Sequence, residues 1–121
     1  MKQSTPTVLD PIQLGPLSLR NRVVMAPLTR GRVANAAGVP DEMNALYYAQ
    51  RASAGLIISE GTWPSREAVG AISIPGLYTD AQAAGWRGVT DAVHAAGGRI
   101  FSQLGVLLAV CIAVAVIARV I

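Results

Sequence analysis

Cysteine and histidine are almost absent from this chain, which contains one of each, Cys111 and His94. A single cysteine excludes an intramolecular disulfide framework and any metal site built from several cysteines. A single histidine also excludes a zinc site that uses a pair of histidines. Charged residues are scarce as well, at 14% of the chain, against roughly a quarter in an ordinary globular protein.

Runs of basic residues are missing, although the formal net charge is +3. The arginines stand singly or in spaced pairs, such as Arg20 with Arg22, which is typical of a solvated surface and argues against a nucleic-acid partner. The N-terminus has no apolar segment of the kind that a secretory signal needs. We therefore expect a cytoplasmic protein, with membrane attachment as the alternative if residues 105–121 form an anchor.

Alternating strand and helix patterns are present instead. Residues 12–14 and 17–19 flank Gly15-Pro16 and predict a small hairpin. Short apolar runs predict three buried strands of the kind found in parallel sheets, at 22–26, 56–59 and 99–103.

Two helices are predicted between these strands. The first begins near Pro40-Asp41, has Met43, Leu46, Tyr47 and Gln50 at helical spacing, and ends before Gly55. The second begins with a capping box, Thr79 and Gln82, and ends at Gly97-Gly98. Its expected apolar face consists of Ala83, Trp86, Val89, Val93 and Ala96. The order predicts right-handed βαβ units and a parallel α/β sheet.

Candidate site residues follow the predicted strands, because sites in α/β folds collect at the carboxyl ends of strands. These ends are Ala26–Thr29, Glu60–Thr62 and Gln103. A threonine hydroxyl, a glycine backbone and a carboxamide are all suitable contacts for a planar heterocycle.

Four segments in these regions carry a recognisable pattern: PIQLGPLSLRNR, NRVVMAPLTRGR, YYAQRASAGLIISEGT and PGLYTDAQAAGWRGVTDAVHAAGGRIFSQL. Together they resemble the N-terminal part of the Old Yellow Enzyme family, over about residues 9–104. Members of that family are FMN-dependent ene-reductases that use NAD(P)H as the hydride donor and a small activated alkene as the substrate. Related flavin barrels act on dienoyl thioesters or amines, and these segments do not separate the chemistries.

The resemblance implies an incomplete TIM (β/α)8 barrel, made of a hairpin that plugs the barrel bottom, the first three strands and two helices. It divides the chain into a barrel part, residues 1–104, and an apolar tail, residues 105–121. Because the family's substrate-binding pair, proton donor and phosphate site follow the position of Leu104, we expect no catalytic residue in this chain. We also expect the chain alone neither to bind FMN tightly nor to reduce alkenes.

The resemblance also implies cofactor contacts. Ala26, Pro27 and Leu28 would line the flavin, and Thr29 would donate a hydrogen bond to the flavin carbonyl beside the reactive nitrogen. Gly61 would leave room for the ring, and Gln103 would pair with its pyrimidine edge. In the family an aromatic residue that faces the substrate commonly follows Gly70, whereas Ala71 stands in this chain.

Each of these residues also has a purely structural interpretation. Thr29 alone is typical of a turn, and Gln103 of a solvated strand end. Glu60 is expected to be a buried acid paired with Arg30 or Arg99. His94 is expected to be solvated, and Trp86 and Tyr47 to pack in the core.

The family pattern stops abruptly after Leu104, where an apolar tail begins. Residues 104–118 carry no charge, but this stretch is shorter than the roughly 20 residues that span a membrane. Three interpretations remain open: a membrane anchor, a buried segment, or a misjoined C-terminus, which the abrupt change favours. The alternative function is a small tail-anchored protein that uses a half-barrel as an interaction module. We expect the third strand to leave an unpaired edge.

Overall fold

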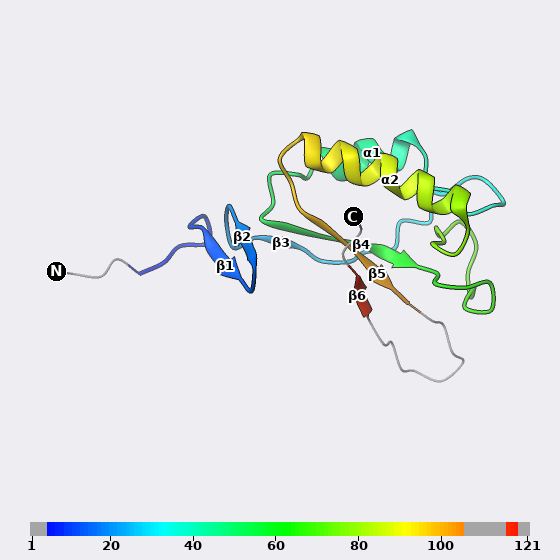
Figure 1. Cartoon of the computed structure of the whole chain (residues 1–121), viewed down its shortest axis with the longest axis horizontal. Coiled ribbons are helices and arrows are strands. Elements are labelled where there is room, and N and C mark those ends of the chain that lie inside the picture. The colour runs from blue at the N-terminus through cyan, green and yellow to red at the C-terminus, as the bar shows by residue number, and fades with distance from the viewer. Residues whose placement is uncertain (1–4, 106–115, 119–121) are drawn as a thin grey trace.

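The computed structural model describes residues 5–105 and 116–118. A two-stranded hairpin precedes a four-stranded sheet, and two helices pack on one another along one side of that sheet (Figure 1). The elements are β1 (Ile12–Leu14), β2 (Leu17–Leu19), β3 (Val24–Met25), α1 (Glu42–Ala49), β4 (Leu56–Thr62), α2 (Asp80–Ala95), β5 (Ile100–Leu104) and β6 (Val116–Ala118).

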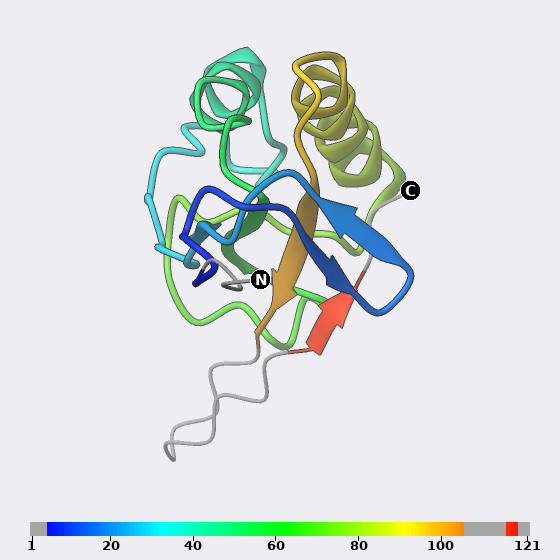
Figure 2. The same ribbon diagram turned by 90° about the vertical axis from the view of Figure 1, so that its left-hand side faces the viewer.

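The predicted hairpin is confirmed. β1 and β2 pair antiparallel with Ile12 opposite Leu19, and the turn uses a positive φ of 56° at Gly15. Glycine adopts this backbone region without the steric cost that a side chain would add. Figure 2 shows the hairpin below the helical layer, apart from both helices.

The sheet has the strand order β3-β4-β5-β6, and its first three strands are parallel, as the alternating pattern predicts. β3 is shorter than expected, whereas β4 continues past Ser59 to Thr62. The register between β4 and β5 shifts between Ile58 and Gly61. This irregularity lets the strand extend through Glu60 and Gly61, which the sequence pattern places after its end.

β6 pairs antiparallel with β5, with Gln103 opposite Ile117. The expectation of an unpaired edge on the third strand is therefore wrong over Ser102–Leu104, because part of the tail occupies that edge. The remainder of the tail, 106–115 and 119–121, lies outside the described residues. Among the described residues, no helix is both long and apolar enough to cross a membrane.

The capping box predicted for α2 is confirmed. Thr79 Oγ1 accepts from the Gln82 N–H at 3.2 Å, and Gln82 Oε1 accepts from the Thr79 N–H at 3.1 Å. At the other end, Gly97 has a φ of 75° and donates to His94 O, while Gly98 donates to Val93 O. These two bonds form a Schellman motif, which satisfies carbonyls in the last turn.

The buried face of α2 combines apolar and polar side chains. Trp86, Val89 and Val93 are buried as predicted, but Ala83 and Ala96 are exposed. Gln82 and Thr90 are buried in their place. The helix therefore turns a slightly different face to the sheet than its apolar spacing indicates.

α1 begins with a second capping box, between Asp41 and Asn44. Asn44 and Tyr48 are its buried residues, whereas Met43 and Leu46 are 65% and 60% exposed. The predicted helix is thus confirmed. The face of α1 that points inward carries Asn44 and Tyr48, and not Met43 and Leu46.

Two apolar clusters lie on β4 and β5. One joins the sheet to the helices and comprises Tyr48, Ala52, Ile57, Trp86, Val89, Val93 and Ile100. The other joins the sheet to the hairpin through Leu19, Leu56 and Ile58, with Phe101 packed against it. Alternate residues of β4 therefore serve opposite clusters, and the hairpin lies at the end of the sheet where β4 and β5 begin (Figure 1).

Candidate functional site

Three of the predicted site residues meet at the carboxyl ends of the parallel strands. Gly61 of β4 lies opposite Gln103 of β5 in the strand register. A Cβ atom at Gly61 would lie 3.7 Å from Thr29 Oγ1 and 3.9 Å from Gln103 Oε1. The hydroxyl and the carboxamide therefore flank a stretch of backbone that has no side chain.

Hydrogen bonds of main-chain groups, two of them to the Ser59 hydroxyl, fix this end of the sheet. The Gln103 N–H donates to Ser59 Oγ at 3.2 Å, and the Gly105 N–H donates to Thr62 O at 3.0 Å. Ser59 Oγ in turn donates to Glu60 O at 2.9 Å. The backbone is thus held at Gln103 and again at Gly105, on the strand whose Gln103 carboxamide lies beside Gly61.

The remaining predicted contacts directly precede Thr29. Ala26, Pro27 and Leu28 follow β3 outside any helix or strand and are exposed, Leu28 by 61%. Exposed apolar side chains next to polar ones are a common feature of ligand sites. Their contact with a flavin stays a prediction.

Glu60 is buried, as predicted, but its partners differ from those expected. Oε2 accepts the backbone N–H of Arg30 at 3.0 Å, and Oε1 accepts the Tyr48 hydroxyl at 3.3 Å. Burial raises the pKa of Glu60 above its usual value, while the bonds from Arg30 and Tyr48 act in the opposite direction. Burial raises the pKa of Tyr48 too.

The Arg30 guanidinium points to Tyr47 rather than to Glu60. Its Nη1 donates to Tyr47 Oη at 2.8 Å, and its central carbon lies 4.4 Å from the centre of the Tyr47 ring. The Arg51 guanidinium lies 3.7 Å from the same centre. Two guanidinium groups therefore lie close to the Tyr47 ring, in a cation–π arrangement at a partly buried position.

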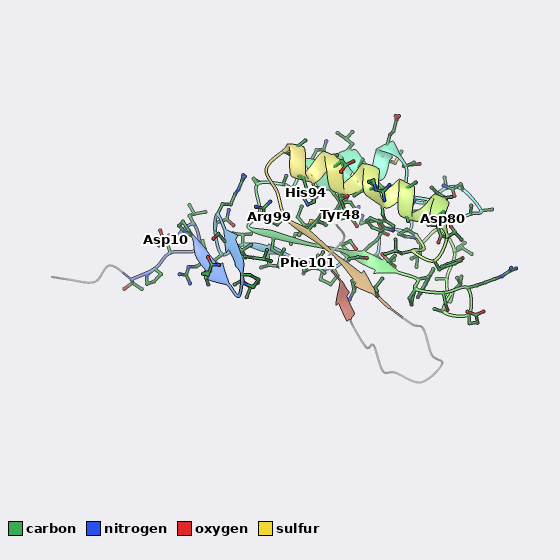
Figure 3. All side chains as sticks on the ribbon, viewed as in Figure 1. Asp10, Tyr48, Asp80, His94, Arg99 and Phe101 are labelled. Carbon is green, nitrogen blue, oxygen red and sulfur yellow. The ribbon has the colours of Figure 1, made fainter. Side chains whose placement is uncertain are left out.

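Trp86 and His94 have the structural roles predicted for them. Trp86 is in the core and donates its indole N–H to Gly76 O at 3.1 Å. His94 is exposed near the end of α2 (Figure 3). Ala71 lines a groove of about 440 Å³ together with Trp63 and Gln82.

The link from Tyr48 to Glu60 is the feature that the sequence analysis missed. Tyr48 is 1% exposed and sits between the helices and the sheet (Figure 3). Its hydroxyl also accepts the Glu60 N–H at 2.8 Å. A buried carboxylate is expected to have a hydrogen-bond donor as its partner, but the sequence alone does not identify that donor.

Comparison with known proteins agrees with this geometry. The family model described as the NADH:flavin oxidoreductase / NADH oxidase family matches residues 7–113. The chain belongs to this family. The resemblance to Old Yellow Enzymes is thereby confirmed. The residues at the strand ends lie within the part of the chain that the family model matches.

Similar family members include both characterised sequences and solved structures. Flavin oxidoreductase hxnT of Emericella nidulans is 48% identical over 101 residues, which are 80% of this chain and 26% of that protein. 12-Oxophytodienoate reductase 7 of Oryza sativa is 44% identical over 104 residues, covering 85% of this chain and 26% of the relative.

Solved structures of family members share the fold of this chain, among them the following two. Morphinone reductase in complex with tetrahydroNAD superposes with a TM-score of 0.79 at 58% identity, covering 83% of this chain and 27% of its own. The Old Yellow Enzyme homologue from Zymomonas mobilis gives a TM-score of 0.78 at 56% identity, covering 82% and 28%. The chain thus spans about a quarter of the length of the relatives that it matches.

Proposed function

We propose that this chain supplies the FMN-contacting ends of the first three strands of an NAD(P)H-dependent alkene reductase with a TIM barrel. The observation that supports this most strongly is the meeting of Thr29, Gly61 and Gln103 at one point. Gly61 lies on β4 and Gln103 on β5, while Thr29 follows the end of β3. Three strands that are far apart in the sequence thus bring these residues together. That arrangement suits a planar ring laid across the strand ends.

The residues present fit a flavin. The backbone at Gly61 is open between a hydroxyl 3.7 Å and a carboxamide oxygen 3.9 Å from the place that a Cβ would fill. A carboxamide both donates and accepts, so Gln103 can pair with the alternating N–H and C=O groups of a pyrimidine edge. Ala26, Pro27 and Leu28 would offer an apolar border, and the barrel part of the chain would be residues 1–104.

Bound flavin would supply hydride transfer between a nicotinamide and an activated alkene. Thr29 would hold a donor at a carbonyl on which charge builds up during reduction, and a fixed donor of this kind stabilises that charge. Gln103 would set the orientation of the ring, and Gly61 its approach to the strand. The substrate-contacting and proton-donating groups are not among these residues.

The names of the relatives support the same class of reaction. They include a flavin oxidoreductase, a 12-oxophytodienoate reductase and a morphinone reductase bound to tetrahydroNAD. A nicotinamide donor and a small organic substrate are therefore the partners that we propose. Ala71 lines the groove beside Trp63, and its small side chain there would suit a substrate of larger cross-section than an aromatic residue would.

Gly61→Ala tests the proposal with little risk to the fold. The added methyl meets its neighbours at ordinary contact distances, 3.7 and 3.9 Å, so the free energy of unfolding should change by no more than about 1 kcal/mol. The methyl occupies the space that we assign to the ring. Titration of the ¹⁵N-labelled chain with FMN should shift the amides of Thr29, Gly61 and Gln103, and the alanine variant should lose these shifts.

Gly88→Ala is the matched control, because its Cβ meets nothing within 4 Å and it lies on α2. This variant should respond to FMN as the unmodified chain does. The NMR readout detects weak binding, so the expected low affinity of the chain alone does not obscure the result. Equal shifts in the Gly61→Ala variant and the unmodified chain would contradict the proposal.

A further inference from the structure

Glu60 stands directly before the open backbone of Gly61, and its carboxylate is not used by the roles assigned so far. The residue is 1% exposed. Its two oxygens bind donors from different elements, the backbone of Arg30 and the hydroxyl of Tyr48 on α1. One side chain therefore connects β4 with α1 and with the segment that follows β3.

Tyr48 makes the orientation of this carboxylate well defined. Its hydroxyl donates to Glu60 Oε1 and accepts the Glu60 N–H, so it holds both the side chain and the main chain of one residue. The ring itself is held by packing: it lies edge-on to Tyr47 at 5.1 Å and tilted against Trp86 at 6.2 Å. A group locked by packing gives an accurate anchor for what it binds.

The other oxygen of Glu60 acts on the segment that carries Thr29. Arg30 follows Thr29 directly, and its N–H is the group that Glu60 Oε2 accepts at 3.0 Å. The Arg30 guanidinium is held separately by Tyr47 Oη at 2.8 Å. Residues 26–29 are exposed and belong to no helix or strand, so the bond at the next N–H is in a position to hold the Thr29 hydroxyl.

We propose that Glu60 is the positioning residue for Thr29, and that it fixes the Thr29 hydroxyl beside Gly61 and Gln103 by binding the Arg30 N–H while Tyr48 holds the carboxylate. The consequence for the cofactor rests on the proposed flavin site. The positioning itself concerns only residues of this chain and can be measured without a ligand.

The test compares Glu60→Met, which keeps the length of the side chain but removes both acceptors, with Glu60→Gln, which retains one acceptor oxygen. In the unmodified chain the ¹⁵N order parameters of the Thr29 and Arg30 amides should be about 0.85, the value typical of a rigid backbone. In Glu60→Met they should fall toward about 0.6. Exchange of the Arg30 amide should accelerate at least tenfold relative to the Val89 and Val93 amides. Glu60→Gln should restore most of the protection.

Tyr48→Phe provides a second test, which keeps the aromatic ring and removes only the anchor hydroxyl. It should increase Arg30 exchange by less than Glu60→Met does. Thr90→Val is its matched control, because it also removes a buried hydroxyl, one that binds Arg87 O on α2, and it should leave Arg30 unchanged. If Glu60→Met does not fold, Tyr48→Phe and Thr90→Val still test the positioning role.

FMN titration of the same samples separates this proposal from the one on which it rests. Loss of Arg30 protection in Glu60→Met or Tyr48→Phe, with a weaker FMN-induced shift of Thr29, supports both. Loss of protection without any FMN shift in the unmodified chain supports the positioning role and overturns the flavin site. Unchanged order parameters and exchange at Thr29 and Arg30 in the variants that fold overturn the positioning role, whatever FMN does.

Discussion

The buried carboxylate of Glu60 couples the protonation state of one residue to the stability of the chain. Burial is the main cause of its raised pKa, and the facing groups are the Tyr48 hydroxyl, the Arg30 and Gly31 amides and the Arg30 charge. The folded chain therefore holds the Glu60 proton more tightly than the unfolded chain does. Stability then depends on pH in the range between the ordinary and the raised pKa.

We predict that the contribution of Glu60 to stability is fully present below its ordinary pKa of 4.5 and is lost as pH rises through the raised value. Each tenfold preference of the folded state for the proton corresponds to about 1.4 kcal/mol. Denaturant unfolding from about pH 4 to pH 8 should show this decline, and Glu60→Gln should lack it. Asp10 and Glu67 have lowered pKa values and act with the opposite sign, but they are unchanged in the comparison. Parallel pH curves for the two proteins would contradict the prediction.

Single residues also show how far the sequence determines the site. The positions of Thr29, Gly61 and Gln103 were predictable, because parallel strands bring their carboxyl ends to one edge. The partners of Glu60 were not. Counting charges suggested an arginine side chain, whereas the donors are a backbone N–H and a phenol, whose directions depend on the packing of α1 against the sheet.

Among the secondary-structure elements, α2 offers two glycines in opposite environments. A Cβ at Gly88 would meet nothing within 4 Å. A Cβ at Gly85 would lie 2.6 Å from Pro40 O and 2.9 Å from Val39 Cγ1, so the absence of a side chain there lets the 39–40 segment approach the helix. The two positions share the same helix, and an alanine at either one gains the same intrinsic helix propensity.

We predict that Gly88→Ala raises the free energy of unfolding by about 0.5–1 kcal/mol, since alanine favours the helical backbone and no contact is disturbed. Gly85→Ala should instead lower it by about 1–3 kcal/mol, because the nearest clash, with the main-chain oxygen of Pro40, cannot be relieved by turning a side chain. Urea unfolding followed by circular dichroism measures both. A stabilising Gly85→Ala would show that the 39–40 segment moves freely away from α2.

Elements with strong local signals were the predictable ones. The hairpin and the capping box of α2 are encoded within a few neighbouring residues, and both are confirmed. The end of β4 was placed too early, because its continuation depends on a register shift against β5 that has no local signature. The capping box of α1 uses Asn44 where glutamate or glutamine is usual, so only its start at Asp41 was visible.

For the whole molecule, the alternation of strands and helices predicted the parallel order of β3, β4 and β5. It could not predict the antiparallel addition of β6, because a short apolar segment fits a strand edge in either direction. Two apolar clusters lie on opposite faces of β4. One attaches the helices to the sheet, and the other attaches the hairpin. The helices thus cover one face of the sheet, and the hairpin packs on residues near the starts of β4 and β5.

The final prediction concerns the chain in the context of a complete relative. We expect a chimera in which residues 7–104 replace the matching segment of morphinone reductase to bind flavin, since the two share 58% identity and a TM-score of 0.79. Purified chimera should be yellow, with one flavin per chain by absorbance. Gly61→Ala in this chimera should remove the colour, while Gly88→Ala should leave it, because only the first adds an atom between Thr29 and Gln103. A folded, monodisperse but colourless chimera would mean that these strand ends do not hold the cofactor.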